Sequence, residues 1–243
     1  MDVPQMTPTL RRLLMFFTVL AVVIVFAAAL NPVSFMIQRL VQIMAAAGAW
    51  GGLLALLWKR KGIRTALLIL PPLAGGLWVL PARKLDTGEL RADYVARLRR
   101  LESTPYFWGG ESPGGIDCSG LPRRALRDAL VSQALRQADP GALREFAHQW
   151  MFDASARALA EGHRGFTRPL GVKGRISEMD YSPLLPGDLA VTEGGAHVLV
   201  FLGGEEWAEA DPDIGQVVIL KGHQDNNAWL KHPVTLHRWS VLL

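Results

Sequence analysis

The chain has 243 residues, which is enough for one ordinary domain and a smaller second part, and half of its residues are hydrophobic. Its positive net charge of +4 comes from the first 80 residues, which carry seven Lys and Arg against one acidic residue. The remainder is nearly balanced in charge, which argues against a nucleic-acid-binding protein with a basic folded surface. A single cysteine, Cys118, excludes an intramolecular disulfide.

Three apolar segments occupy the first 80 residues. Leu13–Leu30 and Leu40–Trp58 contain no charged residue, and each is close to the roughly 20 helical residues that cross a bilayer. Thr65–Leu80 is shorter and is interrupted by Pro71–Pro72. Three buried helices of a soluble protein are the alternative, but charge is absent inside these segments and dense between them. We therefore predict a membrane anchor over residues 1–82, with two or three transmembrane helices.

The basic residues predict which way this anchor faces. With three spans, six basic residues lie on one side of the membrane and three lie on the other. The side richer in Lys and Arg is normally cytoplasmic, so the domain over residues 83–243 is expected outside the cytoplasm. A signal peptide cleaved near Ala27–Ala29 would leave the domain on that same side. Two uncleaved spans would instead place it in the cytoplasm.

The domain over residues 83–243 reads as helices followed by strands. Helical spacing or composition covers Asp86–Ser103, Arg123–Ala138 and Pro140–Gly162, whereas residues 163–187 look irregular. Short β-rich segments separated by turn residues then follow at Asp188–Thr192, His197–Leu202, Trp207–Asp211, Gln216–Leu220 and Val234–Leu243. This order predicts an α+β domain with helices packed on one side of an antiparallel meander.

Cys118 lies in the segment Gly-Gly-Ile-Asp-Cys-Ser-Gly at residues 114–120, directly before a predicted helix. The unpaired N–H groups and the dipole at a helix N-terminus stabilise a thiolate. The same N–H groups can hold the oxyanion of a tetrahedral intermediate. A buried structural cysteine near a turn is the alternative reading of this segment.

His197 is the candidate base among six histidines. It precedes a run that is apolar on both faces, so its imidazole must be hydrogen-bonded or face a cleft; the other five histidines are expected at the surface. If Gly203–Glu205 forms a three-residue loop, Glu209 stands opposite His197 and can accept its Nδ1 proton. A two-residue Gly-Gly turn would swing Glu209 to the other face. Asp211 is the alternative partner.

Four motifs now combine into a family resemblance. They occur in order as Tyr106–Gly110, Asp117–Gly120, Pro186–Leu189, and His197-Val198 with Phe201–Gly203. Together they resemble the NlpC-like cysteine peptidases, compact papain-like enzymes of the bacterial cell wall. The resemblance covers roughly residues 90–220. As in members of that family, a Tyr lies twelve residues before the Cys and a polar residue lies twelve after the His.

The resemblance implies a papain-like α+β fold and a division of roles among six residues. Cys118 would attack an amide carbonyl, His197 would act as base and then as acid to the leaving amine, and Glu209 would orient His197. The residues that would shape the oxyanion side and line the subsites are Tyr106, Asp117 and Ser119.

Three features differ from the usual family pattern. Family members usually have His, Asn or Gln at the position of Glu209, and an aliphatic residue at the position of Pro122. About 65 residues separate Gly120 from Pro186, which predicts a helical insertion at about residues 122–185.

We therefore expect a membrane-anchored cysteine hydrolase that cleaves amide bonds in peptidoglycan stem peptides. It is expected in the bacterial inner membrane as a multi-pass protein, with the catalytic domain facing the periplasm or the outside. Its expected partners are a peptide-like substrate and the lipid bilayer, with no metal, cofactor or nucleic acid. The alternatives are an amidase or acyltransferase acting on lipid or lipid-linked substrates, and a non-catalytic membrane scaffold.

Overall fold

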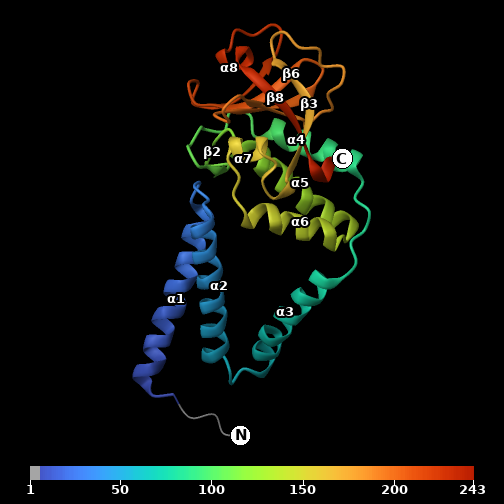
Figure 1. Cartoon of the computed structure of the whole chain (residues 1–243). Helices are drawn as coiled ribbons and strands as arrows, with labels where there is room; N and C mark the ends of the chain where they lie inside the picture. The colour runs from blue at the N-terminus through green and yellow to red at the C-terminus, as the bar shows by residue number, and fades with distance from the viewer. Residues whose placement is uncertain (1–5) are drawn as a thin grey trace. The chain divides into compact units, whose positions relative to one another are not determined.

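The computed structural model describes residues 6–243, and for Leu77 the backbone alone. It divides into two compact units (Figure 1). The first extends to Asn31 and continues over Phe35–Leu80, whereas the second comprises Pro32–Ser34 and Pro81–Leu243.

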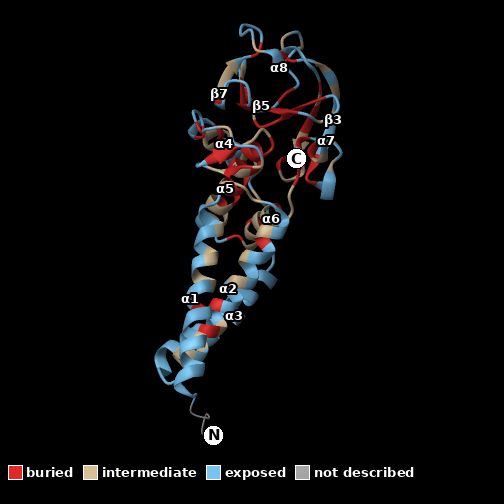
Figure 2. Cartoon of the chain, turned by 90° about the vertical axis from the view of Figure 1, so that its left-hand side faces the viewer, coloured by how far each residue is buried: buried red, intermediate tan, exposed pale blue. Residues whose placement is uncertain are grey.

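The first unit consists of three helices, α1 (Pro8–Leu30), α2 (Met36–Leu56) and α3 (Lys61–Val79). Most of their side chains are exposed, as Figure 2 shows. Helices α1 and α2 approach closely where Thr18 faces Gly52. The approach is possible because Gly52 has no side chain, since a Cβ at this position would collide with the Thr18 hydroxyl. Small residues at such a contact are typical of helices that pack in membranes.

Helix α3 continues through Pro71 and Pro72, where the sequence predicted an interruption. A proline at position 71 has no N–H to donate to the carbonyl of Leu67, one turn earlier. The indole Nε1 of Trp50 donates to that carbonyl at 3.1 Å. The freed backbone group is therefore satisfied from α2, which lets α3 keep its helical path.

The second unit begins with helices. They are α4 (Thr87–Arg100), α5 (Gly120–Gln137), α6 (Pro140–Met151) and α7 (Ala156–Ala160), with α8 (Ala228–Lys231) later in the chain. Asp139 caps α6 as expected, accepting from the N–H groups of Gly141 and Ala142 at 2.9 and 3.3 Å. The single helix predicted over Pro140–Gly162 is broken, because Ser155 caps a new helix by accepting from the N–H of Ala158.

Six strands form one antiparallel sheet in the order β3-β8-β4-β5-β6-β7. Their bounds are β3 (Thr167–Arg175), β4 (Leu189–Thr192), β5 (Val198–Gly203), β6 (Glu206–Asp211), β7 (Gln216–Lys221) and β8 (Pro233–Trp239). The predicted meander is confirmed for β4 to β7, but β8 returns to lie between β3 and β4. Residues 163–187 were expected to be irregular, and that expectation was wrong over β3. The segment expected as a helical insertion therefore also contains an edge strand.

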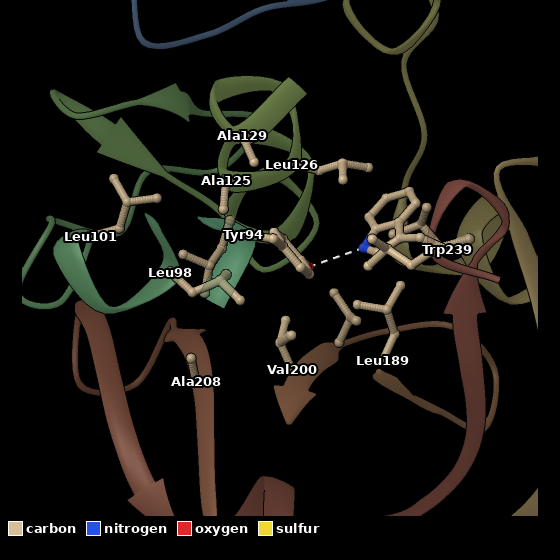
Figure 3. Packing of buried hydrophobic residues seen from close by; sticks show 14 of the residues in the cluster. Tyr94, Leu98, Leu101, Ala125, Leu126, Ala129, Leu189, Val200, Ala208 and Trp239 are labelled. Atoms are coloured by element: carbon tan, nitrogen blue, oxygen red, sulfur yellow. Dashed lines mark hydrogen bonds between the residues drawn. The ribbon is translucent and has the colours of Figure 1, made fainter. Parts of the chain in front are cut away.

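Both faces of the sheet are buried, which explains the uninterrupted apolar run in β5. Val198, Val200 and Leu202 face the core formed with the helices, whereas Leu199 and Phe201 belong to a second cluster on the opposite face. On the helical side, the indole Nε1 of Trp239 donates to the Tyr94 hydroxyl at 3.0 Å (Figure 3). The α+β class predicted from the sequence is confirmed.

Residues Pro32–Ser34, between α1 and α2, belong to the second unit and pair within it. Val33 forms an antiparallel bridge with Gly110, and the carbonyl of Pro32 accepts from the N–H of Glu111 at 2.9 Å. Residues Glu111–Ser112 then form β1, which pairs with β2 (Gly115–Ile116). Residues 110–116, which lead to Cys118, are therefore held by backbone pairing with Pro32 and Val33 and by the pairing of β1 with β2.

Candidate active site around Cys118

The loop that carries Cys118 is held in place by the carboxylate of Asp117. One oxygen, Oδ2, accepts from the N–H of Gly109 at 2.9 Å. The other accepts from the Ser119 hydroxyl at 3.0 Å and from the N–H of Gly120 at 2.6 Å. Both side chains that were expected to line subsites therefore contact the loop itself. Their role toward substrate stays a prediction.

Cys118 immediately precedes the N-cap of α5, as its position before the predicted helix indicated. Its half-buried thiol lies 4.0 Å from the carbonyl oxygen of Ala196 and is hydrogen-bonded with the backbone of Val198. These two residues flank His197. The fold thus brings the head of α5 to the beginning of β5, although 78 positions separate Cys118 from Ala196.

The electrostatic surroundings of the thiol differ from the expectation. Removal from water and the negative charge of Asp117 raise the pKa of the Cys118 thiol to about 12. Backbone hydrogen bonds from Val198, Ser119 and Cys118 itself lower it, but they do not outweigh those two causes. The head of α5 alone therefore does not bring the pKa of the thiol down to neutral pH.

His197 and Glu209 form a buried pair. The imidazole Nε2 lies 2.6 Å from Oε2 of Glu209, and the two residues are 2% and 0% exposed. When Glu209 is ionised, Nε2–H donates to it and Nδ1 is left as the basic nitrogen. We had expected Glu209 to accept from Nδ1, and the geometry reverses that assignment. Burial raises the pKa of Glu209, while the hydrogen bond and the charge of His197 oppose that rise.

The hairpin that supports this pair has a register that neither predicted turn describes. Val200 pairs with Ala208, and a bulge follows before Gly203 pairs with Glu206. Continued by one residue, the Val200–Ala208 register places Glu209 opposite Leu199. The side chains of Glu209 and His197 then lie on the same face of the sheet. The carboxylate reaches the imidazole diagonally, which is a distance that long side chains can span.

Asp211, the alternative partner, has other contacts. Its Oδ1 accepts from the N–H groups of Asp213 and Ile214 at 2.7 and 3.0 Å. Its Oδ2 accepts from the side-chain amide of Asn227 at 2.7 Å. The carboxylate thus closes the turn after β6 and holds the segment before α8.

Tyr106 lies close enough to the thiol to interact with it electrostatically. Burial, followed by the charges of Cys118 and Asp117, raises the pKa of the Tyr106 phenol to about 12. Its backbone N–H donates to the carbonyl of Gly215 at 2.8 Å, which ties it to the turn between β6 and β7. The phenol therefore stays protonated at neutral pH, and its role on the oxyanion side remains a prediction.

Two features near the site were missed by the sequence analysis. The indole of Trp229 stacks on the ring of His197, with centroids 4.1 Å apart and planes at 19°. The carboxylate of Glu111 lies between the guanidinium groups of Arg123 and Arg127, all of them buried. Neither partner set is close in sequence, so no local pattern could have indicated them.

One further expectation concerns a histidine. The expectation that His237 lies at the surface was wrong, because it lies in β8 between β3 and β4 and is 3% exposed. Over residues 6–243, no group of three or more His, Cys, Asp or Glu side chains is arranged to hold a metal ion.

The fold and the site together define a class of protein. A cysteine at the head of a helix, next to the backbone that flanks a buried histidine paired with a carboxylate, is the arrangement of papain-like cysteine peptidases. Residues 103–238 match the NlpC/P60 family. The chain belongs to this family, a papain-like cysteine peptidase family of cell-wall hydrolases.

Several solved structures are similar to this chain. The NlpC/p60 domain of the peptidoglycan hydrolase SagA is 22% identical, with 60% of this chain and 97% of that chain covered and a TM-score of 0.34. The peptidoglycan hydrolase RipB of Mycobacterium tuberculosis is 21% identical, with 66% and 69% covered and a TM-score of 0.37. NlpC1 of Trichomonas vaginalis is 15% identical, with 66% and 48% covered and a TM-score of 0.42. No curated protein matches.

Proposed function

We propose that this protein is a membrane-anchored cysteine hydrolase that cleaves an amide bond in the stem peptides of peptidoglycan. Cys118 is the nucleophile, His197 the base, and Glu209 the group that orients the imidazole. The observation that carries the proposal is the buried His197–Glu209 contact of 2.6 Å beside the backbone that borders the Cys118 thiol. Membership of the NlpC/P60 family supports the choice of substrate.

The raised pKa of the thiol determines how the reaction begins. As Sγ of Cys118 attacks the amide carbonyl carbon, its proton moves to Nδ1 of His197. Glu209 stabilises the imidazolium that forms, and backbone N–H groups at the head of α5 face the developing oxyanion. The C–N bond then breaks, and the amine leaves with the proton from His197. Water attacks the resulting thioester, His197 accepts its proton, and the acid is released as the thiol re-forms.

The anchor is the second part of the proposal. Within residues 6–243, two helices are long and apolar enough to cross a membrane; the mean hydropathy of an 18-residue window is 3.0 in α1 and 1.4 in α2. Helix α3 is less apolar and begins with Lys61 and Arg64. We assign α1, α2 and α3 as three transmembrane helices, with the catalytic domain outside the cytoplasm.

The pairing of Pro32–Ser34 supports three crossings. This segment lies between α1 and α2, yet it belongs to the same compact unit as residues 81–243. If α1 and α2 cross the membrane, residues 32–34 and the catalytic domain must share one side. An even number of crossings must then lie between residues 34 and 81, and α2 together with α3 meets that requirement.

Thiol labelling tests this topology. In a Cys118→Ala background, a cysteine replaces either Lys59, between α2 and α3, or Glu102, in the catalytic domain; both positions are exposed. A membrane-impermeant maleimide applied to spheroplasts should label Glu102→Cys and leave Lys59→Cys unlabelled until the membrane is broken. Labelling of Lys59→Cys alone would refute the assignment.

Digestion of purified sacculi tests the reaction. The full chain in detergent should release peptide fragments with a new amine and a new carboxylate, detected by mass spectrometry. Cys118→Ala and His197→Ala should both abolish release, whereas Glu205→Gln, on an exposed residue, should not. Release by Cys118→Ala would contradict the proposal. Products from lipid-linked substrates alone would favour the lipid-directed alternative, and a cellular phenotype unchanged in Cys118→Ala would favour a scaffold.

A further inference from the structure

The imidazole of His197 is constrained from two directions. Glu209 contacts the ring edge at Nε2, which fixes one atom but allows the ring plane to rotate about that contact. The indole of Trp229 covers the ring face, with centroids 4.1 Å apart and planes at 19°. The edge contact and the face contact together leave a single orientation for Nδ1, the nitrogen that must receive the thiol proton.

Trp229 comes from α8, a helix of four residues that has little stability of its own. Its position depends on Asn227, whose side-chain oxygen accepts from the N–H of Trp229 at 2.7 Å. The side-chain nitrogen of Asn227 donates to Oδ2 of Asp211 at 2.7 Å. A continuous hydrogen-bonded connection therefore runs from the end of β6 to the residue that stacks on the histidine.

Asp211 is well suited to fix this connection. It is 1% exposed, and its second oxygen accepts from two N–H groups of the following turn. Because Asp211 and Glu209 are two residues apart on β6, one strand supplies both constraints on the imidazole. Glu209 acts directly on the ring edge, and Asp211 acts through Asn227 and Trp229 on the ring face.

We propose that Asp211, Asn227 and Trp229 form a positioning arm that holds the plane of the His197 imidazole toward Cys118. This inference rests on the proposed function and extends it. The arm binds no substrate, and its three residues act through His197. The indole face also stabilises the imidazolium that forms during attack, as an aromatic face does for a nearby cation.

The test is the alkylation of Cys118 by iodoacetamide, which needs no substrate and reports on one site because the chain has one cysteine. The full chain in detergent is compared with His197→Ala, Asn227→Ala, Trp229→Leu and Trp229→Phe. Asn226→Ala is the matched control, since Asn226 is an exposed neighbour that contacts Lys231. Thermal unfolding is recorded for every variant. Asn227→Ala removes the connection to Asp211 but keeps the indole itself, so it separates positioning from loss of the volume of the indole.

We expect His197→Ala to slow alkylation at pH 7. Asn227→Ala and Trp229→Leu should slow it by roughly 3- to 30-fold, whereas Trp229→Phe keeps an aromatic face and should retain most of the rate. In the sacculus assay, the same variants should lower kcat and leave KM unchanged. If His197→Ala slows alkylation but Asn227→Ala and Trp229→Leu do not, the arm is refuted and the hydrolase proposal stands. If His197→Ala has no effect, both proposals fail.

Discussion

Replacing Glu209 by Gln tests the electrostatic part of the mechanism without removing the side chain. Glu209 is fully buried, and its only hydrogen bond found in the part of the chain that the structure describes is the 2.6 Å contact with Nε2 of His197. A glutamine has nearly the same shape, and its carbonyl oxygen can accept from Nε2–H. The substitution therefore keeps the ring orientation and removes the negative charge.

The magnitude follows from the kind of hydrogen bond that is lost. A hydrogen bond to a charged group contributes about 1.5–3 kcal/mol, against about 1 kcal/mol for a neutral one. The charge matters most when the imidazole becomes positive, so the loss falls on the transition state. The difference is about 0.5–2 kcal/mol. At about 1.4 kcal/mol per tenfold change in rate, Glu209→Gln should lower kcat/KM by roughly 2- to 30-fold at neutral pH.

The pH dependence gives a sharper check. Burial raises the pKa of Glu209, so the wild-type residue becomes neutral at a higher pH than an ordinary glutamate does. Below that pKa, the wild-type enzyme also lacks the negative charge. The ratio of wild-type to variant activity should therefore be largest at neutral pH and should shrink toward one as the pH falls.

The loss of kcat/KM and the ratio of wild-type to variant activity both come from initial rates of sacculus digestion between pH 4 and 8. Thermal unfolding is measured in parallel. Glu205→Gln is the control, because Glu205 is also a glutamate near a histidine but is exposed, with its Oε1 3.6 Å from Nδ1 of His223. A Glu209→Gln enzyme with unchanged activity would refute the reasoning. A ratio that stays constant across this pH range would show that the charge of Glu209 does not stabilise the imidazolium.

Two further predictions concern stability and the ionisation of the thiol. Glu111→Gln should lower the free energy of unfolding by roughly 3–5 kcal/mol, because Arg123 and Arg127 would face each other without their buried carboxylate. The control is Asp128→Asn, on the half-exposed ion pair with Arg124, which should change the free energy of unfolding by less than about 1 kcal/mol. Equal effects of the two substitutions in urea titrations would contradict this prediction. In the His197→Ala variant, the rate of Cys118 alkylation should rise roughly tenfold per pH unit from pH 7 to 9, because burial and the charge of Asp117 raise the thiol pKa to about 12. A rate that reaches a plateau near pH 7 would mean that the head of α5 ionises the thiol unaided.

The sequence was most informative where local patterns decide the structure. The helical spacing of α4, the Asp139 cap of α6 and the apolar run of β5 each depend on residues close together in the chain. The family was likewise recognisable, because its motifs are short and occur in a fixed order. The edge strand β3 was missed, since its pairing partner β8 begins 58 residues after the end of β3 at Arg175. Pairing over such a separation leaves no local signal.

The residue types of the candidate site could be chosen from the sequence, but their physical states could not. Cys118, His197 and Glu209 were named from spacing and from the resemblance, and their catalytic roles remain predictions. The bulge before Gly203 and the use of Nε2 for Glu209 depend on how β5 and β6 pair. The raised pKa of the thiol depends on how far folding removes it from water and on the orientation of Asp117.

The sequence by itself determined the apolar segments, the meander from β4 to β7, the α+β class, and the family. These follow from periodicity, capping and short motifs, all of which act within a few residues. Only the tertiary structure decided that Pro32–Ser34 pairs beside the Cys118 loop, that Asp211 contacts Asn227 and not the imidazole, and that Trp229 covers the face of the imidazole. Each of these contacts joins segments far apart in the chain, and their geometry is set by the packing of the whole domain.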